Sequence, residues 1–282
     1  MKFHRPEADI FVPDGTDAEQ ALSRTTHLCI CAHQDDMEIF AFHGILECFN
    51  RKDYWFTGVV LTDGAGSARS GEYGQYSDQE MQKVRFREQR KAAQIGEYSA
   101  LIQLLHPSSA VKDNNNRQVV EDLLEILKLA KPKVVYLHNP ADKHDTHVAT
   151  LSKAITALRS LSPGYLPDQV FGCEVWRNLD WVCDEDKVVL PVDGHQNLSA
   201  ALLGVFDSQI AGGKRYDLAT EGRRLSNATY FQSHETDTNT ALTYALDLMP
   251  LLLDKNLKMS DFVSTQIRKF EQDARNRADK FN

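Results

Sequence analysis

The stretch LCICAHQDDME, residues 28–38, decides the fold. Its first five residues are apolar and have the length of a strand that is buried on both faces. Polar residues follow at once, and apolar residues then recur at helical spacing over residues 39–49. A strand that ends in polar residues and turns into a helix places those residues at the carboxyl edge of a parallel sheet, where open α/β sheets bind ligands. The imidazole of His33 and the carboxylates of Asp35 and Asp36 therefore predict a divalent metal with a proton acceptor beside it.

The same succession of strand and helix continues along the chain. It predicts a Rossmann-like α/β fold with a doubly wound, mostly parallel sheet and right-handed crossovers. After the first strand, further strands are expected at residues 55–62, 101–105 and 133–137. The helices between and after them are expected at residues 38–50, 78–95, 119–130 and 148–161.

The rhythm loosens after residue 163, where we expect a C-terminal elaboration of strands and helices. No linker or shift in composition divides the chain, so we expect a polar N-terminal leader over residues 1–24 and a single domain over residues 25–282. Short strands, as antiparallel edge additions, are predicted at residues 170–176 and 187–192. Further helices are predicted at residues 198–210, 240–253 and 260–280.

Composition excludes several classes of protein. The chain of 282 residues has a formal net charge of −8, which argues against a nucleic-acid partner because such proteins present a basic face. No apolar run reaches the roughly 20 residues that span a bilayer. The amino terminus has neither the basic start nor the apolar core of a signal peptide, and the five cysteines match no disulfide framework or zinc ribbon. We therefore expect a cytoplasmic protein.

A second polar cluster follows the predicted strand at residues 133–137. His144 and His147 lie there, three residues apart at the start of a helix, and His33 and Asp36 have the same spacing after the first strand. Catalytic zinc usually takes three protein ligands, so we expect the third ligand to come from the exit of a second strand. A lone histidine beside a carboxylate is more often structural, and four others are interpreted in this way: His27, His106, His195 and His234. His43 is interpreted as a buried or partly exposed histidine of a predicted helix, with an approach to the site as the alternative.

Five short segments carry a resemblance to one known family. They are AHQDD at 32–36, TDGAGS at 62–67, RFRE at 85–88, DKHDTH at 142–147 and SQ at 208–209. In that order they resemble the Ala-His-Pro-Asp-Asp signature, the Thr-x-Gly loop, the Arg-x-x-Glu helix, the Asp-x-His-Pro-Asp-His loop and the late Ser-Gln pair of the LmbE/PIG-L family of zinc-dependent N-deacetylases.

This resemblance implies a hydrolase that removes an N-acyl group, most simply acetyl, from a small-molecule amino sugar such as N-acetylglucosamine or its conjugate. Asp35 would be the general base, His144 would stabilise the oxyanion and Arg85 would bind the substrate, with a surface arginine as the alternative for Arg85. Zinc lowers the pKa of a bound water to about 7, and Asp35 would take the proton of that water. Three residues would hold Zn²⁺ or another divalent transition metal: His33, Asp36 and His147.

The chain departs from the family pattern at several positions. Gln34 stands in place of the signature proline, and Met37 in place of the glutamate that follows the signature. Asp145 and Thr146 replace the Pro-Asp between the two histidines, and Asp207 replaces a late histidine. The expected ligands and the expected base are all kept, so we expect an active hydrolase from a divergent branch.

Three other functions stay open on the sequence. One is an amidase that cleaves a larger acyl group or a thiol conjugate, and another is a catalytically inactive, metal-containing sugar-binding protein. The third is a magnesium-dependent phosphoryl-transfer domain that uses Asp35 and Asp36. The last helix is expected to pack on the body of the protein through an apolar stripe, with a homo-oligomer contact as the alternative. The stripe consists of Phe262, Val263, Ile267 and Phe270.

Overall fold

A computed structural model describes residues 1–282, apart from the side chain of Pro163. Its described residues form one mixed sheet in the order β1-β4-β3-β2-β5-β6-β8-β7. The strands are β1 (Asp9–Phe11), β2 (His27–Cys31), β3 (Phe56–Thr62), β4 (Ala100–His106), β5 (Val134–His138), β6 (Gln169–Cys173), β7 (Lys187–Pro191) and β8 (Leu242–Asp247). Strands β2 to β6 run parallel, whereas β1, β7 and β8 pair antiparallel to their neighbours. The predicted Rossmann-like, mostly parallel sheet is confirmed.

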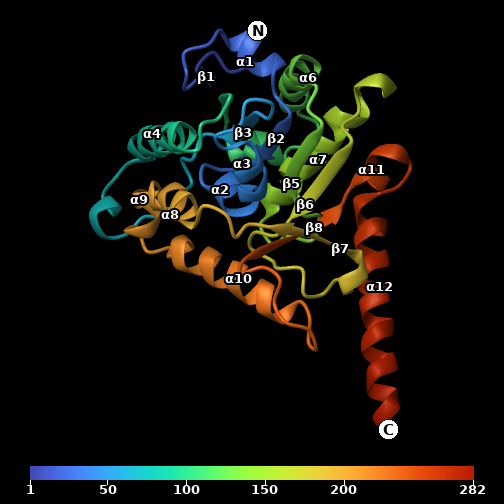
Figure 1. The fold of residues 1–282 in the computed structure, drawn as a ribbon. Coiled ribbons are helices and arrows are strands. Elements are labelled where there is room, and N and C mark those ends of the chain that lie inside the picture. The colour runs from blue at the N-terminus through green and yellow to red at the C-terminus, as the bar shows by residue number, and fades with distance from the viewer.

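Helices cover both faces of this sheet (Figure 1). The first face carries α1 (Ala18–Ser23), α5 (Ser108–Lys112), α6 (Gln118–Ala130), α7 (Asp145–Arg159) and α11 (Met249–Leu253). The second face carries α2 (Asp36–Phe40), α3 (Phe42–Cys48), α4 (Asp78–Ile95) and α8 (Gln196–Gly204). Along β2, Leu28 and Ile30 belong to the first core, and Cys29 and Cys31 to the second. This alternation explains why the strand reads as a continuous apolar run.

The order of the strands places the site. Strands β2 and β5 are parallel neighbours, but the chain continues from β2 to β3 on one side and from β5 to β6 on the other. Neighbouring parallel strands whose crossovers leave in opposite directions open a crevice at their carboxyl ends. The two polar clusters that follow β2 and β5 therefore meet at this crevice.

The helix predicted at residues 78–95 is α4, with the predicted bounds. The side chain of Ser77 accepts a hydrogen bond from the backbone N–H of Glu80, and the side chain of Glu80 accepts from the backbone N–H of Ser77. This reciprocal cap fixes the start of the helix, and Gly96 follows its last residue. The helix predicted at residues 38–50 instead divides at Ala41 into α2 and α3.

Two predictions for the C-terminal part are wrong. Residues 170–176 are predicted as an antiparallel edge addition, but β6 pairs parallel with β5 and lies inside the sheet. Residues 240–253 are predicted as a helix, but β8 occupies their first half and α11 their second. All residues of β8 except the last are buried, and periodicity alone cannot distinguish such a short apolar run from a buried helix. Strand β8 forms because β6 and β7 flank it and pair with its backbone.

The first 24 residues, predicted as a polar leader, contain β1 and α1. Strand β1 pairs with β4 at one edge of the sheet, and Ala21 and Leu22 of α1 are buried in the first core. These residues therefore contribute an edge strand and core side chains. The division of the chain into a leader and one domain stays a prediction.

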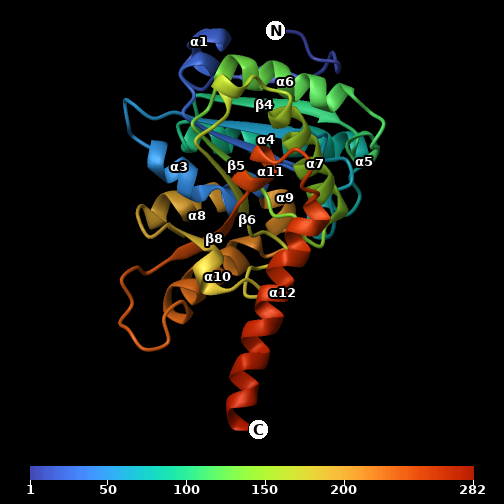
Figure 2. The same cartoon turned by 90° about the vertical axis from the view of Figure 1, so that its right-hand side faces the viewer.

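Three helices complete the chain: α9 (Asp207–Ile210), α10 (Tyr216–Tyr230) and α12 (Met259–Ala278). Helix α12 projects from the body toward the C terminus in both ribbon views (Figures 1 and 2). Phe262, near its start, is buried, but Ile267 and Phe270 are 49% and 40% exposed. The prediction that the apolar stripe packs on the body is therefore wrong beyond the first turn. Among the described helices, none combines the length and the apolar character that crossing a membrane requires.

Candidate active site

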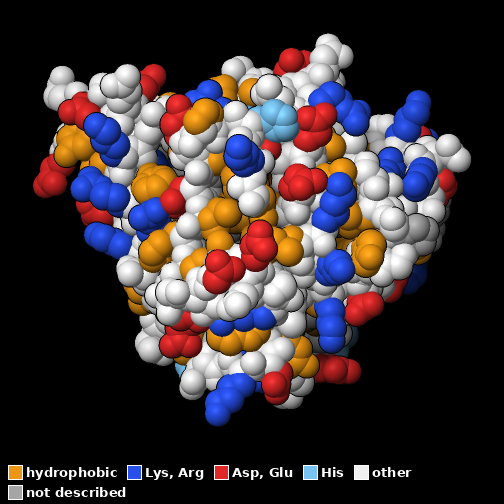
Figure 3. Space-filling view, turned by 90° about the horizontal axis from the view of Figure 1, so that it is seen from above, with side chains coloured by type: hydrophobic (Ala, Val, Ile, Leu, Met, Phe, Trp, Pro, Cys, Tyr) orange, Lys and Arg blue, Asp and Glu red, His pale blue; other side chains and the backbone are white. Residues whose placement is uncertain are grey.

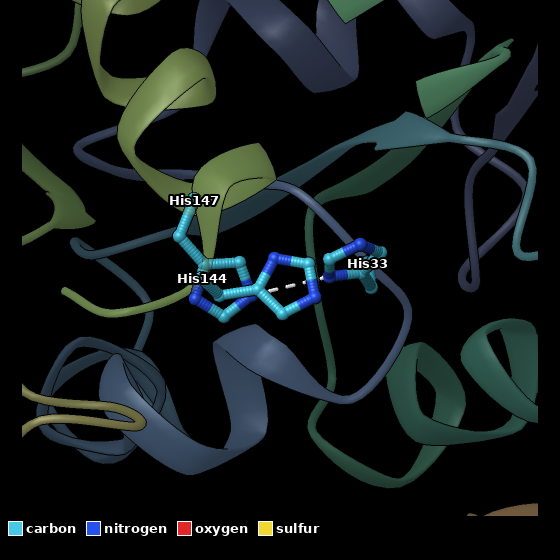
Figure 4. A group of neighbouring side chains, drawn as sticks. All are labelled: His33, His144 and His147. Carbon is cyan, nitrogen blue, oxygen red and sulfur yellow. Dashed lines mark hydrogen bonds between the residues drawn. The ribbon is translucent and has the colours of Figure 1, made fainter. Parts of the chain in front are cut away.

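The two polar clusters come together where β2 and β5 end. His33 lies in the loop after β2, His144 is the N-cap of α7, and His147 lies in the first turn of α7. In Figure 4 the rings of these three histidines gather at one point, with the ring of His147 directed toward His33. Histidines that are distant in the sequence thus share one centre, as the sequence predicts for metal ligands.

Three residues of this centre, one of them through both oxygens of its carboxylate, place donor atoms at the spacing of ligands to one ion. His33 Nδ1 lies 3.2 Å from His147 Nε2 and 3.2 Å from Asp36 Oδ2. His147 Nε2 lies 3.4 Å from Asp36 Oδ1. Ligand atoms at 2.0–2.2 Å from a tetrahedral zinc ion lie about 3.3–3.6 Å apart. Two imidazoles and one carboxylate, which is fixed by the backbone N–H of His33 at 2.7 Å, therefore fit a zinc-type ion.

His138 also faces this centre, and the sequence analysis missed it. It is the last residue of β5, it is fully buried, and its ring stacks on that of His147 with centroids 4.0 Å apart. Two groups of residues at this centre bring their donor atoms close enough for one ion: His33 with His144 and His147, and Asp36 with His138 and His147. However, His138 Nε2 accepts a hydrogen bond from the backbone N–H of Ala32 at 3.0 Å, so its lone pair is occupied and its proton is on Nδ1. Beside Asp36 and His147, His33 therefore fits a third metal ligand better than His138 does.

Asp142 orients the ring of His147 from the side of Nδ1. Its Oδ1 lies 3.5 Å from His147 Nδ1, the ring nitrogen remote from His33, and accepts from the backbone N–H of His144 at 2.9 Å. Its Oδ2 accepts from the backbone N–H of Trp176 at 3.1 Å. Burial acts to raise the pKa of Asp142, but His147 and these hydrogen bonds hold it below its ordinary value. A carboxylate on the far nitrogen of a ligand histidine fixes the ring and its tautomer.

His144 is oriented by the backbone. Its Nδ1 accepts a hydrogen bond from the N–H of Thr146 at 3.3 Å, and burial lowers its pKa. A neutral ring whose Nδ1 accepts must carry its proton on Nε2, which makes Nε2 a donor. The backbone of Thr146 thus does part of the work that the resemblance gives to an acid between the two histidines.

Asp35 lines the same cavity as the metal-type donors but pairs with a different residue. Its backbone has φ +88°, a left-handed value that is strained for a residue other than glycine. Its carboxylate accepts from Arg85 Nη2 at 2.8 Å, whereas Asp36 faces the histidines. Burial raises the pKa of Asp35 to about 6, against the opposing charge of Arg85. The strained turn therefore sends two adjacent carboxylates to different partners.

Arg85 is buried, with 1% of its surface exposed, so the alternative of a surface arginine is wrong. Besides Asp35, it contacts the backbone carbonyl of Gln34 and lies 3.5 Å from Glu88 Oε2. Glu88 in turn accepts from the backbone N–H and the hydroxyl of Ser208, both at 2.7 Å. This chain of contacts joins α4 to α9. Arg85 also lines the cavity, and its substrate contact stays a prediction.

A second buried network holds the backbone of Asp35. The N–H of Asp35 donates to Gln89 Oε1 at 3.0 Å, and Gln89 Nε2 donates to Glu38 Oε1 at 2.7 Å. Tyr98 Oη donates to the same Glu38 oxygen at 2.7 Å. Burial raises the pKa of Glu38 to about 7. No sequence motif indicates this network, which exists only because α4 packs beside α2.

The centre opens into a cavity of about 630 Å³. His33, Asp35 and Asp36 lie on its wall, together with the loop after β3, the loop after β6 and the first turn of α10. A volume of about 300–1,000 Å³ is usual for sites that enclose small molecules. The cavity therefore suits a small-molecule substrate.

Comparison with protein families gives one match. Residues 28–158 match the PIG-L family, described as GlcNAc-PI de-N-acetylase. No curated protein matches the sequence.

Solved structures share the fold at low sequence identity. The conserved protein TT1542 from Thermus thermophilus superposes with a TM-score of 0.60 at 16% identity, over 83% of this chain and 99% of that chain. GalB, the 4-carboxy-2-hydroxymuconate hydratase from Pseudomonas putida KT2440, gives 0.59 at 17%, over 79% and 96%. The N,N'-diacetylchitobiose deacetylase from Pyrococcus horikoshii gives 0.56 at 17%, over 78% and 83%. These likenesses show the fold.

Proposed function

Because residues 28–158 belong to the PIG-L family, we propose that this protein is a metal-dependent hydrolase that removes an N-acyl group, acetyl in the simplest case, from an amino sugar such as N-acetylglucosamine or its conjugate. The fold alone does not fix the reaction, since both a hydratase and a deacetylase share it. The observation that carries the proposal is the spacing of metal-type donor atoms on His33, Asp36 and His147, beside a second acid, Asp35, that is paired with Arg85.

His33, Asp36 and His147 would hold the metal, which we take to be Zn²⁺ from the donor set. Bound there, the ion would lower the pKa of a water molecule to about 7 and polarise the amide carbonyl. Asp142 supports this assignment because it fixes His147 with Nε2 toward the other two donors.

Asp35 would act as the general base and then as the general acid. It takes a proton from the water that attacks the acyl carbon, and it returns that proton to the amine nitrogen when the C–N bond breaks. The products are the free amine and the carboxylic acid. Arg85 keeps the Asp35 carboxylate in place through its 2.8 Å contact, so we assign it a positioning role in addition to any contact with the substrate.

His144 would stabilise the oxyanion that forms on the acyl oxygen. Its Nε2 is a donor because the N–H of Thr146 occupies Nδ1. A fixed donor in a site shielded from water stabilises developing negative charge without reorganisation. On this view His144 works as a neutral imidazole, so the loss of the acid between the two histidines does not abolish its function.

The test is acetate release from N-acetylglucosamine and its conjugates, measured together with metal content. We expect Asp35→Asn to reduce release by about 10³-fold or more and to retain the metal. Asp145→Asn is the matched control, because Asp145 is an exposed acid in the first turn of α7. Activity that survives complete removal of the metal, or full activity in Asp35→Asn, would refute the mechanism.

A panel of acyl lengths on glucosamine separates acetyl hydrolysis from cleavage of a larger acyl group. The cavity of about 630 Å³ admits either substrate. Binding of the amino sugar without turnover, with Zn²⁺ or Co²⁺ in excess, would instead identify an inactive sugar-binding protein.

A further inference from the structure

Residues 65–76, between β3 and α4, form a loop that we call the strap. Arg69 ties the strap to itself, because its guanidinium donates to the carbonyl of Ala65 at 2.8 Å and to the carbonyl of Tyr76. A loop of this length whose ends are held together by its own side chains is an Ω-loop, a type that is frequently functional. In Figure 1 the strap, coloured teal, lies beside α9.

Two side chains fasten the outer half of the strap to the segment around α9. Tyr73 Oη donates to Asp207 Oδ2 at 2.6 Å, and Ser70 Oγ donates to the carbonyl of Gly212 at 2.7 Å. Within residues 70–76, all of which the structure describes, Tyr73 alone is not exposed. The attachment of this half of the strap therefore depends on the two hydrogen bonds.

The segment that receives the strap also holds the expected base in place. Next to Asp207, Ser208 donates its backbone N–H and its hydroxyl to Glu88, both at 2.7 Å. Glu88 Oε2 lies 3.5 Å from Arg85 Nη1, and Arg85 Nη2 donates to Asp35 Oδ2 at 2.8 Å. A shift of Asp207 therefore reaches Asp35 through three buried residues.

Arg85 also contacts both sides of this attachment directly. A Cβ at Gly64, just before the strap, would lie 3.1 Å from Arg85 Cβ, so the backbone there packs against the arginine. The guanidinium carbon of Arg85 lies 5.7 Å from the centre of the ring of Phe206, the residue before Asp207, which is within the range of a cation–π contact. The start of the strap and the α9 segment thus enclose the arginine that pairs with Asp35.

The attachment depends on a departure from the family pattern. Asp207 stands where that pattern has a late histidine, and its carboxylate is the acceptor for Tyr73 Oη. A hydrogen bond to a carboxylate is roughly twice as strong as one between neutral groups. The family motifs alone therefore do not predict this contact.

Charge at a distance does not replace these contacts. Tyr73 is uncharged, so it acts on Asp35 only through the residues between them. On the face drawn in Figure 3, Lys and Arg side chains are interspersed with Asp and Glu. Mixed charges of this kind cancel within about 8–10 Å at physiological salt, so this face adds no strong field at the site.

We propose that Tyr73 is a positioning residue for the proposed reaction. Its hydrogen bond to Asp207 fixes the segment around α9, and that segment keeps Arg85 against Asp35. The proposal rests on the proposed function and assigns no contact between Tyr73 and the substrate. A small displacement of a catalytic group lowers the rate steeply, because the reacting atoms must be aligned.

Tyr73→Phe removes the hydroxyl and keeps the ring. For the best substrate of the acyl panel, we expect kcat to fall about fivefold to tenfold, the factor for one hydrogen bond of ordinary strength. KM should change less than about twofold, because the half of the strap that lines the cavity stays tied by Arg69.

Tyr76→Phe is the matched control. Tyr76 lies on the same strap and packs edge to face on Tyr73, but it is 38% exposed and its hydroxyl takes no part in the attachment to α9. We expect its kcat to equal that of the unsubstituted protein. The same kcat in Tyr73→Phe and Tyr76→Phe would overturn the proposal.

A reversible cross-link tests whether Tyr73 acts through the attachment of the strap. A Cβ at Gly213 would lie 4.0 Å from Ser70 Cβ, within the range of about 3.5–4.5 Å that a disulfide requires. In Tyr73→Phe that also carries Ser70→Cys and Gly213→Cys, we expect oxidation to restore kcat and reduction to lower it again.

The oxidised and reduced forms of one protein are compared because Gly213 has φ +100°, a value that is strained for cysteine. Gly213→Cys alone, treated in the same way, controls for the strain and for the reductant. If the cross-linked form is as slow as its reduced form, Tyr73 does not act through the strap and the proposal is wrong.

Hydrogen exchange provides a readout without turnover. In Tyr73→Phe, but not in Tyr76→Phe, we expect the backbone amides of residues 207–213 to exchange about fivefold to tenfold faster. The amides of the central strand β2 should be unchanged in both variants. If no acyl group is released from any sugar but this faster exchange is found, the attachment is supported and the proposed reaction is wrong. If exchange in residues 207–213 is unchanged, the positioning role is wrong regardless of the reaction.

Discussion

Gln89 links the expected base to the buried carboxylate behind it. Replacing Gln89 with Met keeps an unbranched side chain of similar size but removes both hydrogen bonds of the amide. The backbone N–H of Asp35 loses its acceptor at 3.0 Å, and Glu38 loses a donor at 2.7 Å. An unpaired buried N–H costs about 1–3 kcal/mol, and a hydrogen bond to a carboxylate contributes about 1.5–3 kcal/mol. We expect the free energy of unfolding to fall by about 2.5–6 kcal/mol.

Urea denaturation measures this loss, with Gln94→Met as the control. Gln94 lies on the same helix but is exposed, so the same substitution there should change the free energy of unfolding by less than about 0.5 kcal/mol. We also expect kcat to fall about tenfold or more in Gln89→Met, because the strained φ of +88° at Asp35 persists only while its surroundings hold it. Equal urea midpoints for the two variants would show that the network does not support the turn.

Three further predictions concern stability. Burial lowers the pKa of His27 to about 4 from its ordinary 6.5. Between these two pH values the unfolded chain protonates His27 and the folded chain does not, so the free energy of unfolding decreases as the pH is lowered through this range. Between pH 7 and pH 5, His27→Gln should remove about 2 kcal/mol of this acid loss. Urea denaturation at the two pH values measures the effect, and a loss of stability as large as in the unsubstituted protein would contradict it. Gly44→Ala should destabilise the protein by about 1–3 kcal/mol, because its Cβ would lie 2.5 Å from the Tyr136 ring. Gly222→Ala has open space around the new Cβ and should stabilise the protein by about 0.5–1 kcal/mol. Thermal melts in which both variants shift the melting temperature in the same direction would refute this reasoning. Zn²⁺ at 100 times its Kd should add about 2.7 kcal/mol, an effect that a chelator or His147→Ala removes, and a melting temperature indifferent to Zn²⁺ would contradict the metal site.

Much of the fold follows from the sequence because its central strands are buried on both faces. Strand β2 is apolar from Leu28 to its end, and β3 has Val59, Val60 and Leu61 at its centre. Polar or turn residues follow each strand. Strand β8 could not be found in this way, since its six residues form a strand only through pairing with β6 and β7. Helix α10 also went unpredicted, because it is largely polar and is held by contacts with distant elements such as β8.

In the candidate site, too, some features could be predicted from the sequence and others depend on tertiary contacts. His33, Asp36 and His147 could be predicted because polar residues at strand exits meet at one edge of a parallel sheet. His138, the last residue of β5, could have been found by the same rule. Its tautomer could not, because it depends on the backbone N–H of Ala32, 106 positions away. The burial of Arg85 is likewise a tertiary effect, produced by α4 lying against the loop that follows β2.

Helix α12 gives the molecule a shape that scattering can detect. A compact chain of this length has a radius of gyration of about 19 Å, and the 20 residues of α12 span about 30 Å. A monomer with this extension would show a long tail in its pair-distance distribution at large separations. If two copies associate through Ile267 and Phe270, the forward scattering would instead report twice the mass, and α12 would connect the bodies of the two copies.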